Sequence, residues 1–288
     1  MLKTLRRPGA FAGLLVLTAT AGIVGLPTPA TASSGLGIET VSDPGRTDSL
    51  DKTTTVTCPK GKKVIDAGGS IEYTAGGKVV MDDVFPDPTM KFVNVTGLES
   101  DHITTDWRAE ADAVCAYPLP GQEWIKAQTV SNSSSPKTLT VACSHGKTVL
   151  GNGYAITGGS GEVWVDEAVP NGDETHAATQ VSLVGVEGDP YDGDWDLEGF
   201  LICADPLPGQ RVLRDSTSPS THGDLAAMYC VDDDQAPTGA TAEIHNGTGT
   251  VVLTEDLLLN GVSIADADEN DSPDDDWYLT TYIFCVDA

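Results

Sequence analysis

The chain has 288 residues and carries 43 aspartates and glutamates against 16 lysines and arginines, a formal charge of −27. Nucleic acids and anionic membranes bind cationic surfaces, so this composition argues against both as partners. Acidity of this degree favours solubility in a salty exterior or, as the alternative, the binding of divalent cations.

Residues 1–32 have the three parts of a secretory signal peptide: a cationic start, an apolar run over residues 11–26, and small residues up to Ala32. We predict cleavage after Ala32 and a secreted, extracellular protein. A membrane anchor is the weaker alternative, because threonine and glycine interrupt the run and it falls short of the roughly 20 apolar residues that span a bilayer. All six cysteines follow this segment. An even number in an exported chain predicts disulfides.

An Asp-Trp pair, followed by a cysteine eight residues after the tryptophan, occurs three times. The pairs are Trp107 and Cys115, Trp195 and Cys203, and Trp277 and Cys285. Apolar and polar residues alternate between the tryptophan and the cysteine, which predicts a half-buried strand. In the last two copies both faces become apolar near the cysteine, so we expect burial on both sides there. The constant spacing predicts that the three tryptophans are core residues.

Around this strand the chain divides into three similar units, residues 35–117, 118–205 and 206–288. In chain order, the first unit shows an opening strand near residues 38–41, a strand ending at Cys58, a glycine-rich strand from Val64, strands at 79–83 and 92–95, and the Trp–Cys strand. Helical periodicity is missing, so the fold class is all-β. We expect three homologous, disulfide-stapled antiparallel β units, arranged as a pseudo-three-fold prism, as a sandwich, or as beads in a row.

Two cysteine pairings respect the repeat. Pairing within units joins Cys58 to Cys115, Cys143 to Cys203 and Cys230 to Cys285; pairing between units joins Cys115 to Cys143, Cys203 to Cys230 and Cys58 to Cys285. We favour the first, because each small unit then carries its own staple. Each bond would contribute roughly 4 kcal/mol to stability in the chain-entropy model.

The turn after the first cysteine of each unit carries a family resemblance. Residues 58–62 read Cys-Pro-Lys-Gly-Lys and residues 143–147 read Cys-Ser-His-Gly-Lys. Together with the glycine-rich strand and the closing Trp–Cys strand, this resembles a repeat of secreted actinobacterial proteins that carries a Cys-Pro-x-Gly-Lys turn. The third unit departs from it, since Cys230 is followed by Val-Asp-Asp-Asp. The resemblance implies a fold and an extracellular compartment, and no activity.

Catalytic motifs are missing from the sequence. There is no Gly-x-Ser-x-Gly elbow, and the histidines lack the spacing of zinc ligands. The scattered histidines are His102, His145, His176, His222 and His245. We therefore expect no catalytic residues and a non-enzymatic role. An extracellular hydrolase, assembled from histidines and carboxylates of different units, is the second alternative.

An acidic turn precedes each of the three tryptophans, and we expect any function to lie beside these turns. The third turn is the richest, and alternate carboxylates and amides can surround calcium. Its tentative ligands are Asp266, Asp268, Asn270 and Asp274. The turn is no EF-hand, because Gly is missing at the sixth position and Trp277 replaces the twelfth-position glutamate. Calcium is the one cofactor that the sequence suggests.

Two tryptophans, Trp124 and Trp164, do not recur in all three units. They are the best candidates for platforms on which a sugar ring could stack. The aromatic content of 6% is low for a lectin. We therefore predict a binding or structural protein with an extracellular glycan or protein as partner. A carbohydrate-binding module, with or without calcium, is the first alternative.

Overall fold

The computed structural model describes residues 35–72, 78–188, 190–220, 224–232, 234–270 and 276–287. All the regular secondary-structure elements in these segments are β-strands, which confirms the predicted all-β class. None of these segments forms a helix that is long and apolar enough to cross a membrane. The predicted signal peptide lies outside the described residues.

Each of the three predicted units, called repeats 1, 2 and 3 below, contributes six strands. Repeat 1 contains β1 (Glu39–Asp43), β2 (Lys52–Thr57), β3 (Lys63–Glu72), β4 (Val79–Pro86), β5 (Phe92–Glu99) and β6 (Arg108–Ala116). Repeat 2 contains β7 (Glu123–Gln128), β8 (Lys137–Ala142), β9 (Thr148–Thr157), β10 (Val163–Pro170), β11 (Gln180–Glu187) and β12 (Asp196–Ala204). Repeat 3 contains β13 (Arg211–Ser216), β14 (Asp224–Tyr229), β15 (Gln235–His245), β16 (Val251–Leu259), β17 (Val262–Glu269) and β18 (Tyr278–Asp287).

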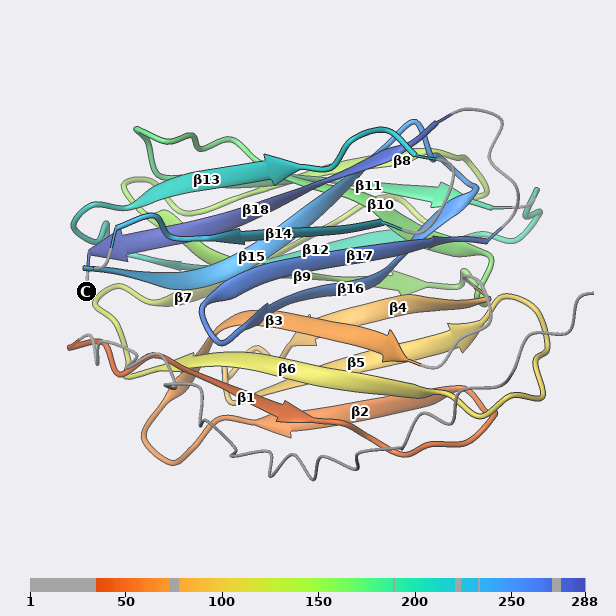
Figure 1. Ribbon diagram of the computed structural model, residues 1–288, viewed down its shortest axis with the longest axis horizontal. Helices are drawn as coiled ribbons and strands as arrows, with labels where there is room; N and C mark the ends of the chain where they lie inside the picture. The colour runs from red at the N-terminus through yellow and green to blue at the C-terminus, as the bar shows by residue number, and fades with distance from the viewer. Residues whose placement is uncertain are drawn as a thin grey trace, which may run out of the picture. The chain divides into compact units, whose positions relative to one another are not determined.

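Each of the three six-stranded sheets combines three strands of one repeat with three strands of another. The orders are β1-β6-β3-β16-β17-β14, β13-β18-β15-β10-β11-β8 and β2-β5-β4-β9-β12-β7. The third strand of each repeat lies antiparallel to the fourth strand of another: β3 beside β16, β9 beside β4, and β15 beside β10 (Figure 1). Each repeat is thereby joined to both others.

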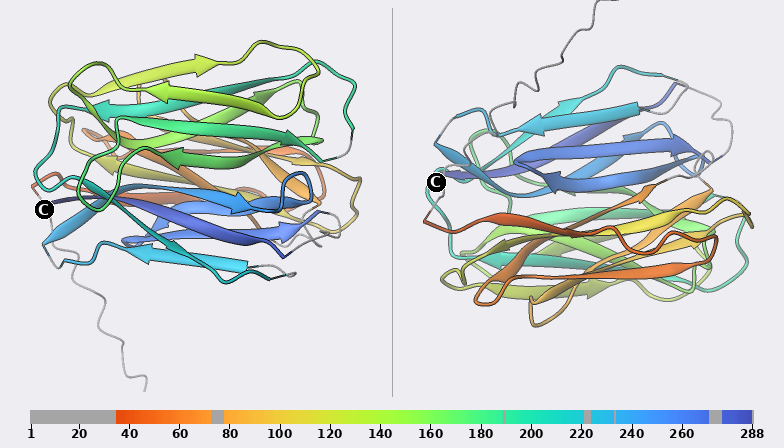
Figure 2. Two further views of the ribbon diagram at one scale, coloured as in Figure 1. Left: turned by 90° about the horizontal axis from the view of Figure 1, so that it is seen from above. Right: turned by 60° about the horizontal axis from the view of Figure 1, so that its bottom comes forward.

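This pairing makes the three repeats a pseudo-three-fold prism and excludes beads in a row. In the left-hand view of Figure 2 the green strands of repeat 2 and the blue strands of repeat 3 form the upper and lower layers. The orange and yellow strands of repeat 1 lie behind them.

Each disulfide joins the two sheets to which its own repeat contributes. Cys58 follows β2 and pairs with Cys115 on β6, which lies in another sheet. Cys143 with Cys203, and Cys230 with Cys285, repeat this arrangement. Pairing within units is therefore confirmed. The repeats are held to one another by strand pairing and packing, while the disulfides hold each repeat together.

The tryptophans of the Trp–Cys strands are core residues, as predicted, because all three are fully buried. Each indole N–H donates to a glutamate that ends the fifth strand of its own repeat. The pairs are Trp107 and Glu99 at 3.1 Å, Trp195 and Glu187 at 2.8 Å, and Trp277 and Glu269 at 3.3 Å. A buried indole needs such an acceptor, so the glutamate fixes how the last strand lies against the fifth.

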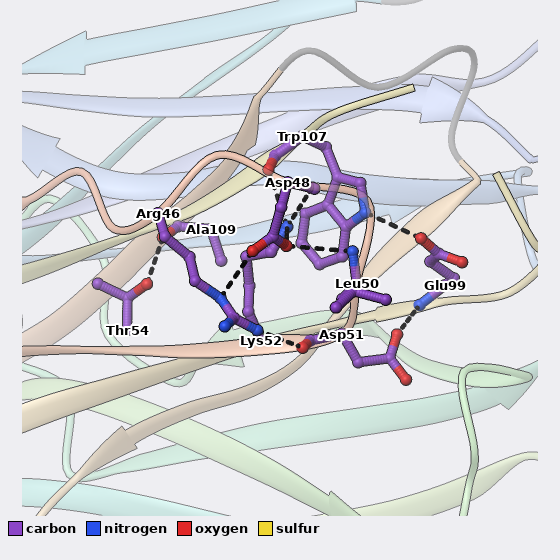
Figure 3. Close-up of polar contacts among 9 residues, drawn as sticks. All are labelled: Arg46, Asp48, Leu50, Asp51, Lys52, Thr54, Glu99, Trp107 and Ala109. Atoms are coloured by element: carbon purple, nitrogen blue, oxygen red, sulfur yellow. Dashed lines mark hydrogen bonds and ion pairs between the residues drawn. The ribbon is translucent and has the colours of Figure 1, made fainter. Parts of the chain in front are cut away.

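Charged side chains surround the Trp107 ring in repeat 1 (Figure 3). The Lys52 ammonium lies 3.4 Å from the ring centroid and donates to the main-chain oxygens of Asp48, at 2.6 Å, and Trp107, at 2.8 Å. The Asp48 carboxylate lies 3.1 Å from Lys52 Nζ and 3.1 Å from Arg46 Nε. A cation over an indole face is attracted by the ring quadrupole. This cluster ties the segment before β2 to the start of β6.

Asp66 lies where the third strands of all three repeats meet. In register, Asp66 corresponds to Gly151 and Gly239, each following the bulge of its strand. Its carboxylate accepts the main-chain N–H of Asn152 at 2.9 Å and of Ala240 at 3.0 Å. A Cβ at Gly151 would lie 2.3 Å from Asp66 Oδ1, and one at Gly239 would lie 2.8 Å from Asp66 Cγ. One side chain therefore fills the axis for all three repeats. Burial raises the pKa of Asp66 well above its usual value, although the hydrogen bonds oppose the shift.

Candidate axial binding site

A pocket of about 220 Å³ opens where the three acidic turns begin. Its lining comes from equivalent positions of all three repeats. Lys78, Glu162 and Thr250 precede the fourth strands, Ser100, Gly188 and Asn270 follow the fifth strands, and Asp101 and Gly249 complete the lining. The described residues with which the three predicted turns begin therefore meet at one end of the prism. We call this hollow the axial pocket.

The main chain of the axial pocket is the same in each repeat. The N–H that follows each fifth strand donates to the carbonyl that precedes the fourth. The bonds run from Ser100 to Lys78 at 3.0 Å, from Gly188 to Glu162 at 3.1 Å, and from Asn270 to Thr250 at 2.8 Å. These bonds continue the pairing of the fourth and fifth strands at the open end of their hairpin. The backbone around the axial pocket is thus the same in each repeat, while the two residues that each repeat places on it differ.

Lys78 links repeat 1 to repeat 3 across the wall of the axial pocket. Its ammonium donates to the main-chain oxygen of Asn270 at 2.8 Å and lies 3.1 Å from Asp101 Oδ2. Ser100 Oγ donates to Asn270 Oδ1 at 3.3 Å and to the Lys78 carbonyl at 3.2 Å. The Lys78 side chain remains 34% exposed. The wall of the axial pocket therefore presents the Lys78 ammonium, the Asp101 carboxylate and the Ser100 hydroxyl, which these hydrogen bonds and the ion pair keep in place.

The glutamate that begins the first acidic turn is charged at neutral pH. Burial acts against the charge of Glu99, but hydrogen bonds from the Trp107 indole and the Ile103 amide outweigh it and lower its pKa. The Ile103 amide lies 3.3 Å from Glu99 Oε2. The Trp–Cys strand thus positions the turn that leads into the axial pocket.

Trp164 lies behind the axial pocket, in a small apolar cluster with Val80, Val186 and Val252. Its indole N–H donates to the Val251 carbonyl of repeat 3 at 2.9 Å, and the residue is 2% exposed. A Cβ on the pocket residue Gly188 would lie 2.1 Å from the Trp164 ring, so this place requires glycine. A stacking platform must be exposed, so the expectation that Trp164 presents its ring at the surface is wrong. Its ring instead supports the pocket wall.

Trp124 is the other predicted platform. It lies on β7, the edge strand of the sheet β2-β5-β4-β9-β12-β7, and does not line the axial pocket. It is half-buried, and its indole N–H donates to the Pro86 carbonyl at 2.8 Å. The ring stacks on Phe200 with centroids 5.4 Å apart and planes at 24°, and Phe200 meets Phe85 edge-on at 4.9 Å. The structure does not bring Trp124 and Trp164 together. A ligand-binding role for Trp124 stays a prediction.

The predicted calcium ligands divide between two places. Asp266 and Asp268 lie on β17 and line a second pocket, of about 340 Å³, with Glu72 and Glu255. Asn270 lines the axial pocket instead. Asp274 lies outside the described residues. Within the described segments no group of three or more histidines, cysteines, aspartates or glutamates is placed to hold a metal ion. The calcium site as a whole stays a prediction.

The described histidines lie on separate segments of the chain. His102 and His176 are exposed, 3.3 Å from Glu99 and 3.0 Å from Asp173. His145 is exposed in the turn after Cys143. His245 stacks on Tyr278 with centroids 4.1 Å apart. His222 lies outside the described residues. The placement of these four histidines offers no shared cleft for the hydrolase alternative.

Comparison with protein-family models and with curated proteins found no match.

The sequence pointed to the acidic turns but missed the residues before the fourth strands. Lys78 and Glu162 belong to no motif. Aligning the three units on the fourth strand would have shown that lysine, glutamate and threonine occupy one position. That these three side chains face a common pocket follows from the prism.

Proposed function

We propose that this chain is a non-enzymatic extracellular binding protein that takes a polar, hydroxyl-rich ligand, such as the terminal sugar of a glycan, in the axial pocket. One observation carries the proposal: equivalent positions of all three repeats converge on one polar pocket of about 220 Å³. Sites for drug-sized ligands measure roughly 300–1,000 Å³. A pocket below that range suits the end of a larger molecule.

The lining offers the donors and acceptors that sugar hydroxyls need. Lys78 donates, the carboxylates of Asp101 and Glu162 accept, and the hydroxyls of Ser100 and Thr250 do both. Because the three repeats contribute different side chains, the pocket can distinguish the orientation of a ligand in spite of the regular backbone around it.

An extracellular location supports the same proposal. The three disulfides are typical of extracellular proteins. Secretion through the predicted signal peptide would place the pocket where glycans are exposed. We therefore also propose that the protein is secreted.

The proposal is tested by a broad glycan array, followed by titration of any bound glycan against Lys78→Met and Glu162→Gln. We expect each substitution to weaken binding by about tenfold or more, because a hydrogen bond to a charged group contributes roughly 1.5–3 kcal/mol. Trp124→Ala compares the two candidate sites: it should bind as the wild type does if the axial pocket holds the ligand, and loss of binding only in this variant would make Trp124 the platform instead. Binding that survives both pocket substitutions, or silence across the array, would refute the axial site.

The calcium-assisted form of the proposal has its own test. A chelator added to the wild-type complex should abolish binding if calcium bridges the protein and the glycan. Unchanged affinity in the chelator would remove calcium from the proposal and leave the axial pocket itself untouched.

A further inference from the structure

The outer face of β14 presents apolar side chains to solvent. β14 is the terminal strand of its sheet, next to β17 and then β16 (Figure 1). Leu225 and Tyr229 are 55% and 63% exposed, and Ala227 between them is also exposed. Ile264 lies opposite Ala227, and Leu259, 39% exposed, continues the row of Tyr229. We call these five residues the β14 patch.

In the other two repeats, five of the six equivalent positions are threonine. In register, the three exposed β14 positions correspond to Thr53, Thr55 and Thr57 of β2 and to Thr138, Thr140 and Ala142 of β8. Those threonines form hydroxyl ladders, with Thr53 and Thr96 oxygens 2.9 Å apart and Thr140 and Ser182 oxygens 3.1 Å apart. The fold therefore tolerates threonine at these positions. The apolar residues of repeat 3 are not required by the fold, and exposed apolar patches commonly mark interaction sites.

An acidic pocket adjoins the β14 patch on the same face of the sheet. Leu225 lies opposite Asp266, which lies opposite Glu255, which lies opposite Ser70. Asp266, Glu255, Glu72 and Asp268 line the pocket of about 340 Å³ described above. A bound basic side chain would offset the repulsion among these four carboxylates.

We infer that the β14 patch and the adjoining acidic pocket together bind an extended segment of another protein in which an apolar stretch is followed by a basic stretch. The apolar side chains would cover Leu225 and Tyr229, and the basic ones would reach the carboxylates of Glu255 and Asp268. A second copy of this chain fits poorly as the occupant, because a chain with a formal charge of −27 would bring further negative charge to the same face. The surface shares no lining residue with the axial pocket.

The test uses a fluorescent peptide of about ten residues with leucines in one half and lysines in the other. Binding to the purified protein is followed by anisotropy at low and at high salt. Replacing Leu225 and Tyr229 together by threonine, as in repeat 1, should weaken binding by about tenfold or more and leave the melting temperature unchanged. Glu255→Gln with Asp268→Asn should also weaken binding, and the remaining binding should depend less on salt.

Controls separate this surface from general charge attraction. Thr138→Ala with Thr140→Ala, on the equivalent face of repeat 2, should leave peptide binding unchanged, as should Lys78→Met in the axial pocket. Equal binding by the threonine variant and the wild type would overturn the inference. So would equal binding of a peptide in which serine replaces every leucine. A dimer seen by light scattering, and lost in the threonine variant, would make a second copy the occupant and would also overturn it.

Discussion

We expect the free energy of unfolding to fall as the pH rises, and replacing Asp82 by asparagine should reduce this fall. Asp82 sits at the bulge of β4, is 6% exposed, and has no hydrogen-bond partner for Oδ1 among the described residues. Burial, with the charges of Asp83 and Asp51, raises its pKa to about 8. The equivalent position is Asp166 in repeat 2 and uncharged Thr254 in repeat 3. The bulge therefore accepts a neutral side chain.

The sign and size of the effect follow from linkage between protonation and folding. Between pH 4 and pH 8 the folded protein keeps the Asp82 proton, while the unfolded chain, with its ordinary pKa of 3.8, loses it. The stability due to this proton is complete below the unfolded pKa. As the pH rises towards the folded pKa, the free energy of unfolding falls by about 1.4 kcal/mol per pH unit. The advantage of Asp82→Asn should thus grow from near zero at pH 4 to an upper limit of about 5 kcal/mol at pH 8.

Urea unfolding at pH 5, 6, 7 and 8, with the disulfides intact, measures this slope. The variant keeps part of the slope, because burial also raises the pKa of Asp166 to about 7. Asp82→Thr copies the third repeat and should behave as Asp82→Asn does. Asp173→Asn is the control, since hydrogen bonds from Thr175 and His176 lower the pKa of that exposed carboxyl. Parallel pH profiles for the wild type and Asp82→Asn would refute the reasoning.

Three further changes test the prism itself. Asp66→Ala should lower the free energy of unfolding by about 2–6 kcal/mol in urea titrations, because the amides of Asn152 and Ala240 lose their acceptor, and each unsatisfied buried donor costs about 1–3 kcal/mol. Gly188→Ala should cost about 1–3 kcal/mol through the clash with Trp164, and should reduce glycan binding in the titration described above. Reducing all three disulfides should lower the unfolding midpoint sharply, since each contributes about 4 kcal/mol in the chain-entropy model; an unchanged midpoint would contradict their role as staples.

Local patterns determined much of the fold. The alternation after Trp107 predicted a strand with one buried face, and the structure has β6 there with Ala109, Ala111 and Ala113 buried. The repeat left two cysteine pairings open, and the structure has the favoured one, with a disulfide within each unit. Such features depend on neighbours in sequence, on a period of two residues and on fixed spacings, and these can be read directly from the chain.

The partner of each strand was decided only by the tertiary structure. The local sequence does not predict that β3 pairs with β16 of the third repeat, because these two strands are far apart in the chain. Strand pairing between repeats placed Asp66 on the axis opposite two glycines and buried Trp164 against repeat 3. It also separated Asn270 from Asp266 and Asp268.

The sequence alone therefore determined an all-β chain of three stapled repeats and drew attention to its acidic turns. The prism decided which side chains those turns bring together, because three equivalent positions around one axis share a single space. The axial pocket, the side chain on the axis and the apolar face of β14 all arise where the repeats meet or differ, and so depend on contacts that only the folded chain makes.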